Sequence, residues 1–194
     1  MRGLLFSFLL LSTFCVSAQQ IQRDDMLSLY RSLASKNWDS AYIKANALIN
    51  KFPNDSSDFK ATINYALILS AAGKVSNHTM SYPELRQTAK SIMGKHIMMP
   101  AHFVNTDTLS IAPSITVLND NNGRSKGTTI IKNAEGNTVL CFEDFEFKEQ
   151  LDLASFKNAK YRCGGKLNTV EINSYMDDIW IMRLRITDAI ILKM

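Results

Sequence analysis

The sequence predicts a mixed α+β protein, in which an N-terminal antiparallel helical array precedes a five-stranded β-barrel with one helix between its third and fourth strands. Three observations lead to this prediction. Apolar residues recur every three or four positions in the first half of the chain, they alternate in short runs after Pro100, and these runs come in the order three strands, one helix, two strands. We therefore divide the chain into a signal peptide (1–18), a helical domain (19–100) and a β-barrel domain (101–194).

The first 18 residues have the pattern of a cleavable secretory signal. Arg2 supplies a positive charge, residues 4–14 are mostly apolar, and Val16 and Ala18 are the small residues that a signal peptidase reads. We expect cleavage between Ala18 and Gln19. An uncleaved membrane anchor is the alternative, but a spanning helix needs about 20 apolar residues. The sequence therefore predicts a periplasmic or secreted protein without a transmembrane segment after signal removal.

Four helices are expected between the signal and Pro100, because each stretch combines a start signal with helical spacing of apolar residues. The expected helices run from Asp24 or Asp25 through Leu33, from Asn37 to Phe52, from about Asp58 to Ala72 with an end at Gly73, and from near Tyr82 to about His96. Short connections between them favour antiparallel packing.

The second expected helix carries a partial resemblance to a tetratricopeptide repeat. The residues that carry it are Asn37-Trp38-Asp39-Ser40-Ala41 and Phe52-Pro53-Asn54-Asp55, where an aromatic and an alanine precede a closing proline. The match covers about 20 of the roughly 34 residues of such a repeat. A generic helical hairpin would show the same features, so both interpretations stay open.

The second half of the chain contains five expected strands and one helix. The strands are Ser114–Leu118, Thr128–Lys132, Thr138–Phe142, Ala159–Leu167 and Ile179–Leu192. The helix is expected from Phe145 to Phe156, where Phe147, Leu151 and Ala154 share one face and would plug the end of the barrel. This order is that of an OB-fold, a partly open five-stranded barrel.

Residues 113–192 resemble the exported OB-fold proteins of the tRNA_anti-like family. The resemblance rests on Val139-Leu140-Cys141-Phe142, on Leu151–Phe156, on Tyr161-Arg162-Cys163-Gly164-Gly165-Lys166 and on Ile186-Thr187-Asp188-Ala189-Ile190. It implies a barrel related to nucleic-acid-binding OB-folds. It brings no catalytic residues to this chain and does not by itself imply a role with tRNA.

No constellation typical of catalysis or metal binding stands out in the sequence. The histidines His78, His96 and His102 are scattered and belong to no metal-binding motif. The acidic run from Glu143 to Asp152 is interpreted as the solvated first turns of the expected helix, and Gly164-Gly165 as a tight turn. We therefore predict a protein that is not an enzyme and that has no cofactor and no metal.

Two cysteines and two aromatic residues remain as features of interest. Cys141 and Cys163 are expected as buried thiols, with a disulfide as the alternative, because the expected barrel order does not make their strands neighbours. Tyr175 and Trp180 are the aromatics expected to be exposed on a binding face. Stacking on such rings would suit single-stranded nucleic acid, but residues 101–194 carry eleven Lys/Arg against twelve Asp/Glu, too few positive charges to favour phosphate.

Three functional hypotheses follow. The first is an exported non-enzymatic interaction protein, which uses the helices for docking and the barrel as a binding module, with another protein of the cell envelope or outside as partner. The second is an oligonucleotide- or glycan-binding OB module, which would show exposed aromatics on the first three strands. The third is an enzyme whose site combines ordinary residues, which would show a deep pocket with several titratable groups of perturbed pKa.

Overall fold

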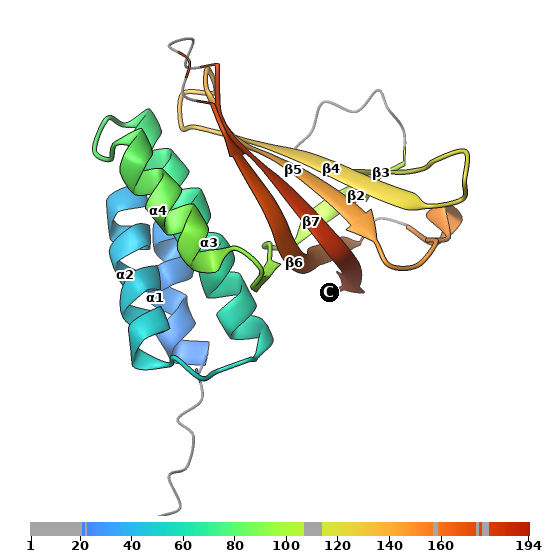
Figure 1. Cartoon of the computed structure of the whole chain (residues 1–194). Coiled ribbons are helices and arrows are strands. Elements are labelled where there is room, and N and C mark those ends of the chain that lie inside the picture. The colour runs from blue at the N-terminus through green and yellow to red at the C-terminus, as the bar shows by residue number, and fades with distance from the viewer. Residues whose placement is uncertain (1–20, 22, 107–113, 157–158, 174, 176–178) are drawn as a thin grey trace, which may run out of the picture.

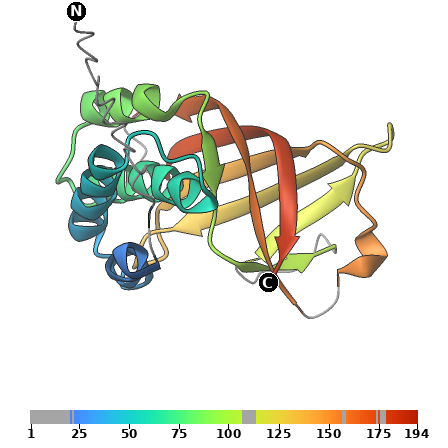
Figure 2. The same ribbon diagram turned by 90° about the horizontal axis from the view of Figure 1, so that it is seen from below.

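The computed structural model describes residues 21, 23–106, 114–156, 159–173, 175 and 179–194, and it shows a helical layer followed by a β-sheet (Figures 1 and 2). The helices are α1 (Arg23–Ala34), α2 (Trp38–Lys51), α3 (Asp58–Ser76) and α4 (Tyr82–Ile92). The strands are β1 (His96–Met98), β2 (His102–Asn105), β3 (Ser114–Asn119), β4 (Ser125–Lys132), β5 (Val139–Phe147), β6 (Lys160–Ile172) and β7 (Trp180–Lys193). The predicted α+β class and the order of helices before strands are confirmed.

Side-chain caps start three of the helices where the sequence indicates. The Asn37 and Ser57 side chains accept from backbone N–H groups in the first turns of α2 and α3, and Ser81 forms a capping box with Glu84 at the start of α4. These bonds satisfy N–H groups that have no partner within the helix.

Helix α3 is the central element of the molecule and is buried along most of its length. It packs against α1, α2 and α4 on one side and against β1, β5 and β7 on the other. The expected end at Gly73 is wrong, because α3 continues to Ser76. Gly73 lies inside the helix, where the Trp38 ring occupies the space that a side chain would need. This glycine therefore serves helix packing and does not end the helix.

The seven strands form one sheet in the order β1-β6-β2-β3-β4-β5-β7, and β6 also pairs with β7. Pairing is parallel between β2 and β3 and between β5 and β7, and antiparallel elsewhere. The sheet therefore closes on itself through β6, but it is not a regular barrel, because β1 and β2 share one edge of β6 and register shifts interrupt the pairing of β6 with β7. The Gly164-Gly165 pair lies inside β6, where an added Cβ would collide with the carbonyl oxygens of Ile97 and Thr187.

The predicted count of five strands is wrong, because β1 and β2 also belong to the sheet. The helix that was expected to reach His96 ends at Ile92, and His96 begins β1. Both added strands are short. Strand β1 pairs with β6, and β2 pairs with both β3 and β6. Strand β1 also precedes Pro100, so the sheet begins before the predicted start of the barrel domain.

The predicted helix from Phe145 to Phe156 is also wrong. Its first part continues β5, in which the side chains of Phe145 and Phe147 are buried on one face of a strand paired on both sides. The rest forms a single 3₁₀ turn, Leu153–Ser155, capped by Asp152. The spacing of Phe147, Leu151 and Ala154 fitted a helix, but the backbone hydrogen bonds available from β4 and β7 favour the strand as far as Phe147.

Candidate functional site

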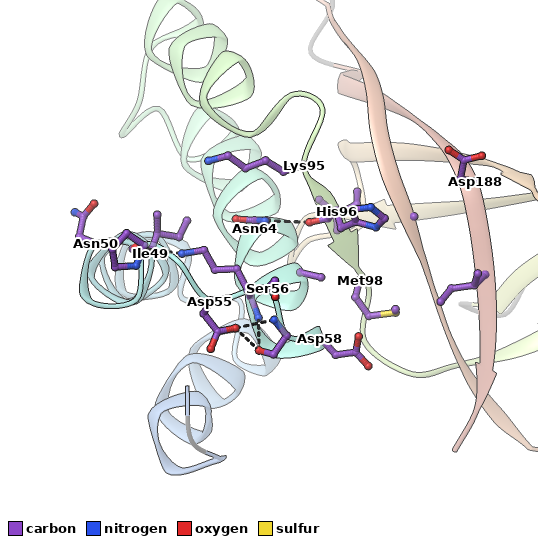
Figure 3. Close-up of a pocket in the computed structure, with 17 residues that line it drawn as sticks. Ile49, Asn50, Asp55, Ser56, Asp58, Asn64, Lys95, His96, Met98 and Asp188 are labelled. Carbon is purple, nitrogen blue, oxygen red and sulfur yellow. Dashed lines mark hydrogen bonds between the residues drawn. The ribbon is translucent and has the colours of Figure 1, made fainter. Parts of the chain in front are cut away.

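Two pockets open along the line where the helical layer meets the sheet. The first, here called the junction pocket, has a volume of about 600 Å³ and is shown in Figure 3. It lies between the end of α2, the start of α3 and the strands β1, β6 and β7, and its polar lining residues are Asn50, Asp55, Ser56, Ser57, Asp58, Lys60, Asn64, Lys95, His96 and Asp188. Carboxylates and cations are mixed around this pocket, so no single sign of charge dominates it.

Two polar side chains in the junction pocket already serve the fold. The Lys60 ammonium donates to the carbonyl oxygens of Ile49 (3.1 Å) and Phe52 (2.5 Å), and so satisfies acceptors at the end of α2. Burial lowers the pKa of Lys60. The Asn64 amide donates to the carbonyl oxygen of His96 at 3.0 Å and ties α3 to β1, while its Oδ1 has no hydrogen-bond partner among the described residues. Lys60 thus stabilises the helical layer, and Asn64 joins the helices to the sheet.

The second pocket, here called the junction groove, is the larger, with a volume of about 920 Å³. That volume lies at the upper end of the range of about 300–1,000 Å³ typical of small-molecule sites. Its apolar lining comes from both layers: Tyr30, Leu33, Ala34, Trp38, Tyr65 and Leu69 from the helices, and Pro100, Ala101, Ile130 and Ile131 from the sheet side. The wall formed by β3 and β4 is completed by Ser114, Thr116, Thr128 and Thr129.

The basic side chains that line the junction groove are two lysines and one histidine. Its lining contains Lys36, Lys132 and His102, and no carboxylate among the described residues. Lys36, in the turn between α1 and α2, donates from Nζ to the carbonyl oxygens of Lys132 (3.4 Å) and Asn133 (2.9 Å). This contact places the Lys36 ammonium beside the backbone of Lys132, and neither lysine forms an ion pair with a described residue. The groove therefore combines an apolar wall with a positive rim.

A buried carboxyl group lies in the core next to the junction groove. Glu143 on β5 is fully buried, and neither of its oxygens has a hydrogen-bond partner among the described residues. Its opposite neighbour on β4 is Thr129, a residue of the groove wall. Burial raises the pKa of Glu143 to about 8, whereas the nearby Tyr65 hydroxyl lowers it and Asp144 raises it further. Tyr65 is thus close enough to influence the carboxyl, but it does not reach hydrogen-bonding geometry.

The titratable groups around Glu143 are also buried. Burial and the proximity of Glu143 raise the pKa of Tyr65, and burial followed by the same carboxyl raises those of the Cys141 and Cys163 thiols. At neutral pH all four groups are therefore expected to be protonated. An uncharged cluster is the arrangement that a low-dielectric interior tolerates best. Both cysteines are free, and neither thiol is activated as a nucleophile.

The residues singled out from the sequence lie in several different places. Tyr175 has 82% of its surface exposed in the connection between β6 and β7. Trp180 begins β7 and is half-buried, with its ring 6.2 Å from that of Phe142 in an edge-to-face arrangement. Neither residue lines the junction groove. The predicted cleavage site between Ala18 and Gln19 lies outside the described residues.

The interpretation of the acidic run as a solvated helix face is wrong for Glu143, which points into the core of the sheet. The signal that could have revealed this is the alternation of Cys141, Glu143, Phe145 and Phe147, all of the same parity. The junction groove left no comparable signal, because its residues come from segments far apart in the sequence.

The comparisons with known proteins returned no relatives. No family model, no curated protein and no solved structure matches the chain. Among the described residues, no group of three or more histidine, cysteine, aspartate or glutamate side chains could hold a metal ion. None of the described helices combines the length and the apolar character that crossing a membrane requires.

Proposed function

We propose that this chain is an exported, non-enzymatic binding protein whose ligand occupies the junction groove. The observation that carries the proposal is the groove itself, a large pocket with mainly apolar walls contributed by both the helical layer and the sheet. Pockets of this size and character at the boundary between two structural units are the usual sites of ligand binding. Export follows from the N-terminal signal pattern and implies a periplasmic or secreted location.

The strand pairing supports an OB-like ancestry for the sheet. Strands β3, β4, β5, β6 and β7 would be the five strands of such a fold, and the parallel pairing of β5 with β7 beside the antiparallel pairing of β6 with β7 suits this assignment. Strand β2 would then be an insertion between β3 and β6. The proposed barrel serves as a binding module, and the helices form the facing wall and a docking region for a protein partner.

A tryptophan reports directly on the proposed site. Trp38 lines the junction groove and is 4% exposed, while Trp180 lies elsewhere. The W180F variant leaves Trp38 as the single tryptophan of the mature chain and keeps an aromatic ring beside Phe142. Titrating this variant with dodecanol, a neutral apolar probe, should shift or quench the Trp38 emission in a saturable manner.

Two further substitutions locate the binding. Ile130 lies in the groove wall and is 48% exposed, so I130D adds a carboxylate to the groove without burying it fully. Leu118 on neighbouring β3 is 41% exposed and does not line the groove, so L118D is the matched control. We expect I130D to weaken dodecanol binding and L118D to leave it unchanged. No saturable binding by the W180F protein, or equal effects of the two aspartates, would contradict the proposed site.

A further inference from the structure

The junction groove has one end that differs chemically from the rest. The α1–α2 turn meets the end of β4 there, and Lys36 Nζ lies 2.9 Å from the carbonyl oxygen of Asn133 and 3.4 Å from that of Lys132. These two carbonyls compensate part of the desolvation of the ammonium, but they carry no formal charge. Neither Lys36 nor Lys132 forms an ion pair with a carboxylate among the described residues.

The walls beyond this rim are mainly apolar and provide few polar partners for a charged ligand. The helical side presents Leu33, Trp38 and Leu69, and the sheet side presents the exposed Ile130 together with threonine hydroxyls. An extended hydrocarbon chain would remove these apolar surfaces from water. A ligand with charge at both ends, or with several charges, would instead leave charges without partners along the walls.

We propose that the junction groove binds a single-chain amphiphile with an acidic head group, such as a fatty acid, with the head group at Lys36 and Lys132 and the acyl chain along the apolar walls. This inference rests on the proposed function and adds the class of ligand to it. Charge complementarity decides the orientation, because the described lining has two lysines at one rim and no carboxylate that would repel the head group.

The buried carboxyl next to the groove is compatible with this ligand. Glu143 lies behind Tyr65 and Thr129, and its protonated form adds no negative charge close to the acyl chain. The Glu143 carboxyl is therefore mostly uncharged at neutral pH.

The test compares ligands that share one chain and differ in the head group. The mature W180F protein is titrated with dodecanoate, dodecanol and dodecyltrimethylammonium, each below its micelle concentration, with Trp38 emission as the readout. We expect dodecanoate to bind most tightly and the cationic amphiphile least tightly. Raising the salt concentration from about 0.05 M to about 0.5 M should weaken dodecanoate binding and leave dodecanol binding nearly unchanged.

Two lysine substitutions assign the head-group site. K36Q and K132Q should each weaken dodecanoate binding by about twofold to fivefold, the range expected for a partly exposed ion pair. Neither should change the affinity for dodecanol. Lys132 has no side-chain hydrogen bond among the described residues, so K132Q keeps the test valid even if K36Q perturbs the turn. Circular dichroism and thermal melting verify that each variant is folded.

Each outcome of these titrations discriminates between the two proposals. Preference for dodecanoate that is lost in the lysine variants supports the acidic amphiphile. Equal binding of dodecanoate and dodecanol, unaffected by the lysine variants, overturns the acidic head group and leaves the groove as an apolar binding site. Absence of saturable binding by all three probes overturns both this inference and the proposed function.

Discussion

Replacement of Glu143 by glutamine should make the protein more stable at neutral pH, although the substitution is in the core. Glu143 is fully buried and both its oxygens lack partners. Glutamine has nearly the same shape and cannot ionise, so the substitution removes the proton equilibrium and little else. The size of the effect depends on how far the buried carboxyl lowers the free energy of unfolding at each pH.

The magnitude follows from the two pKa values of Glu143. Its pKa is about 8 in the folded protein, against 4.5 as the ordinary value for an unfolded chain. Between these values the folded state holds a proton that the unfolded state has released, so the stability of the wild type falls as pH rises. The slope is about 1.4 kcal/mol per pH unit. About 3 kcal/mol is therefore lost by pH 7, nearly 5 kcal/mol above pH 8, and almost nothing below pH 4.5.

Urea unfolding of the wild type and E143Q at several pH values measures this dependence. The difference between the two proteins cancels the contributions of all other titrating groups. We expect similar stabilities near pH 4.5 and an advantage for E143Q that grows to about 3 kcal/mol at pH 7. Asp144 provides the control, since it is half-exposed on the other face of β5, 3.5 Å from Arg183 Nε. The D144N variant keeps Glu143 and should therefore still lose stability as the pH rises from 4.5 to 8.

Two results would refute this reasoning. A constant difference between E143Q and the wild type from pH 4.5 to 8 would mean that Glu143 does not change protonation differently in the two states. A loss of stability in E143Q at pH 7 would mean that the carboxylate has partners that the structure does not contain.

Three further predictions concern the packing of the layers. G73A should destabilise the protein by about 1–3 kcal/mol in urea unfolding, because the new methyl group would collide with the Trp38 ring. Alanine usually stabilises a helix relative to glycine, so a stabilised G73A variant would contradict this packing. K60M should cost about 1.5–3 kcal/mol in the same assay, because the carbonyls of Ile49 and Phe52 lose a charged donor, and an unchanged midpoint would show that the capping contributes nothing. Cys141 and Cys163 should resist a thiol reagent in the native, unreduced protein and both react after unfolding, whereas no free thiol after unfolding would reveal a disulfide.

The helical layer could be predicted from the sequence because its signals are local. Capping residues, a proline in a first turn and the spacing of apolar residues define α1, α2 and α4 within a few positions. The end of α3 escaped prediction because Gly73 has the same local signature whether it ends a helix or makes room for a ring. Only the position of Trp38, which precedes it by 35 residues, distinguishes the two cases.

The sheet could be predicted only where strands are long enough to show alternation. Strands β3, β4, β6 and β7 were found near their expected positions. Strands β1 and β2 have only three and four residues; β1 pairs with β6, and β2 with β3 and β6. The end of β5 was mistaken for a helix, because a run of phenylalanines and acids is compatible with both periods. The same error concealed Glu143, whose burial depends on strands β4 and β7 and on helix α3.

The candidate site could not be predicted, because its residues come from several segments that are far apart in the sequence. The groove needs the α1–α2 turn, α3 and the β3–β4 wall to meet, and Lys36 and Lys132 are 96 positions apart. The resemblance to OB-fold proteins directed attention to the aromatics Tyr175 and Trp180, which lie away from the groove. Tertiary packing creates this site, and no local sequence pattern indicates it.

Native mass spectrometry of the protein purified from the cells that produce it tests the central claim most directly. The wild type and L118D should carry one equivalent of a small ligand, and its mass and its loss in negative-ion mode should identify a single-chain acid. I130D should carry none, because its new carboxylate lies in the groove wall. A wild type that is free of ligand and also takes up none from added dodecanoate or dodecanol, or an I130D variant as fully loaded as L118D, would contradict the account.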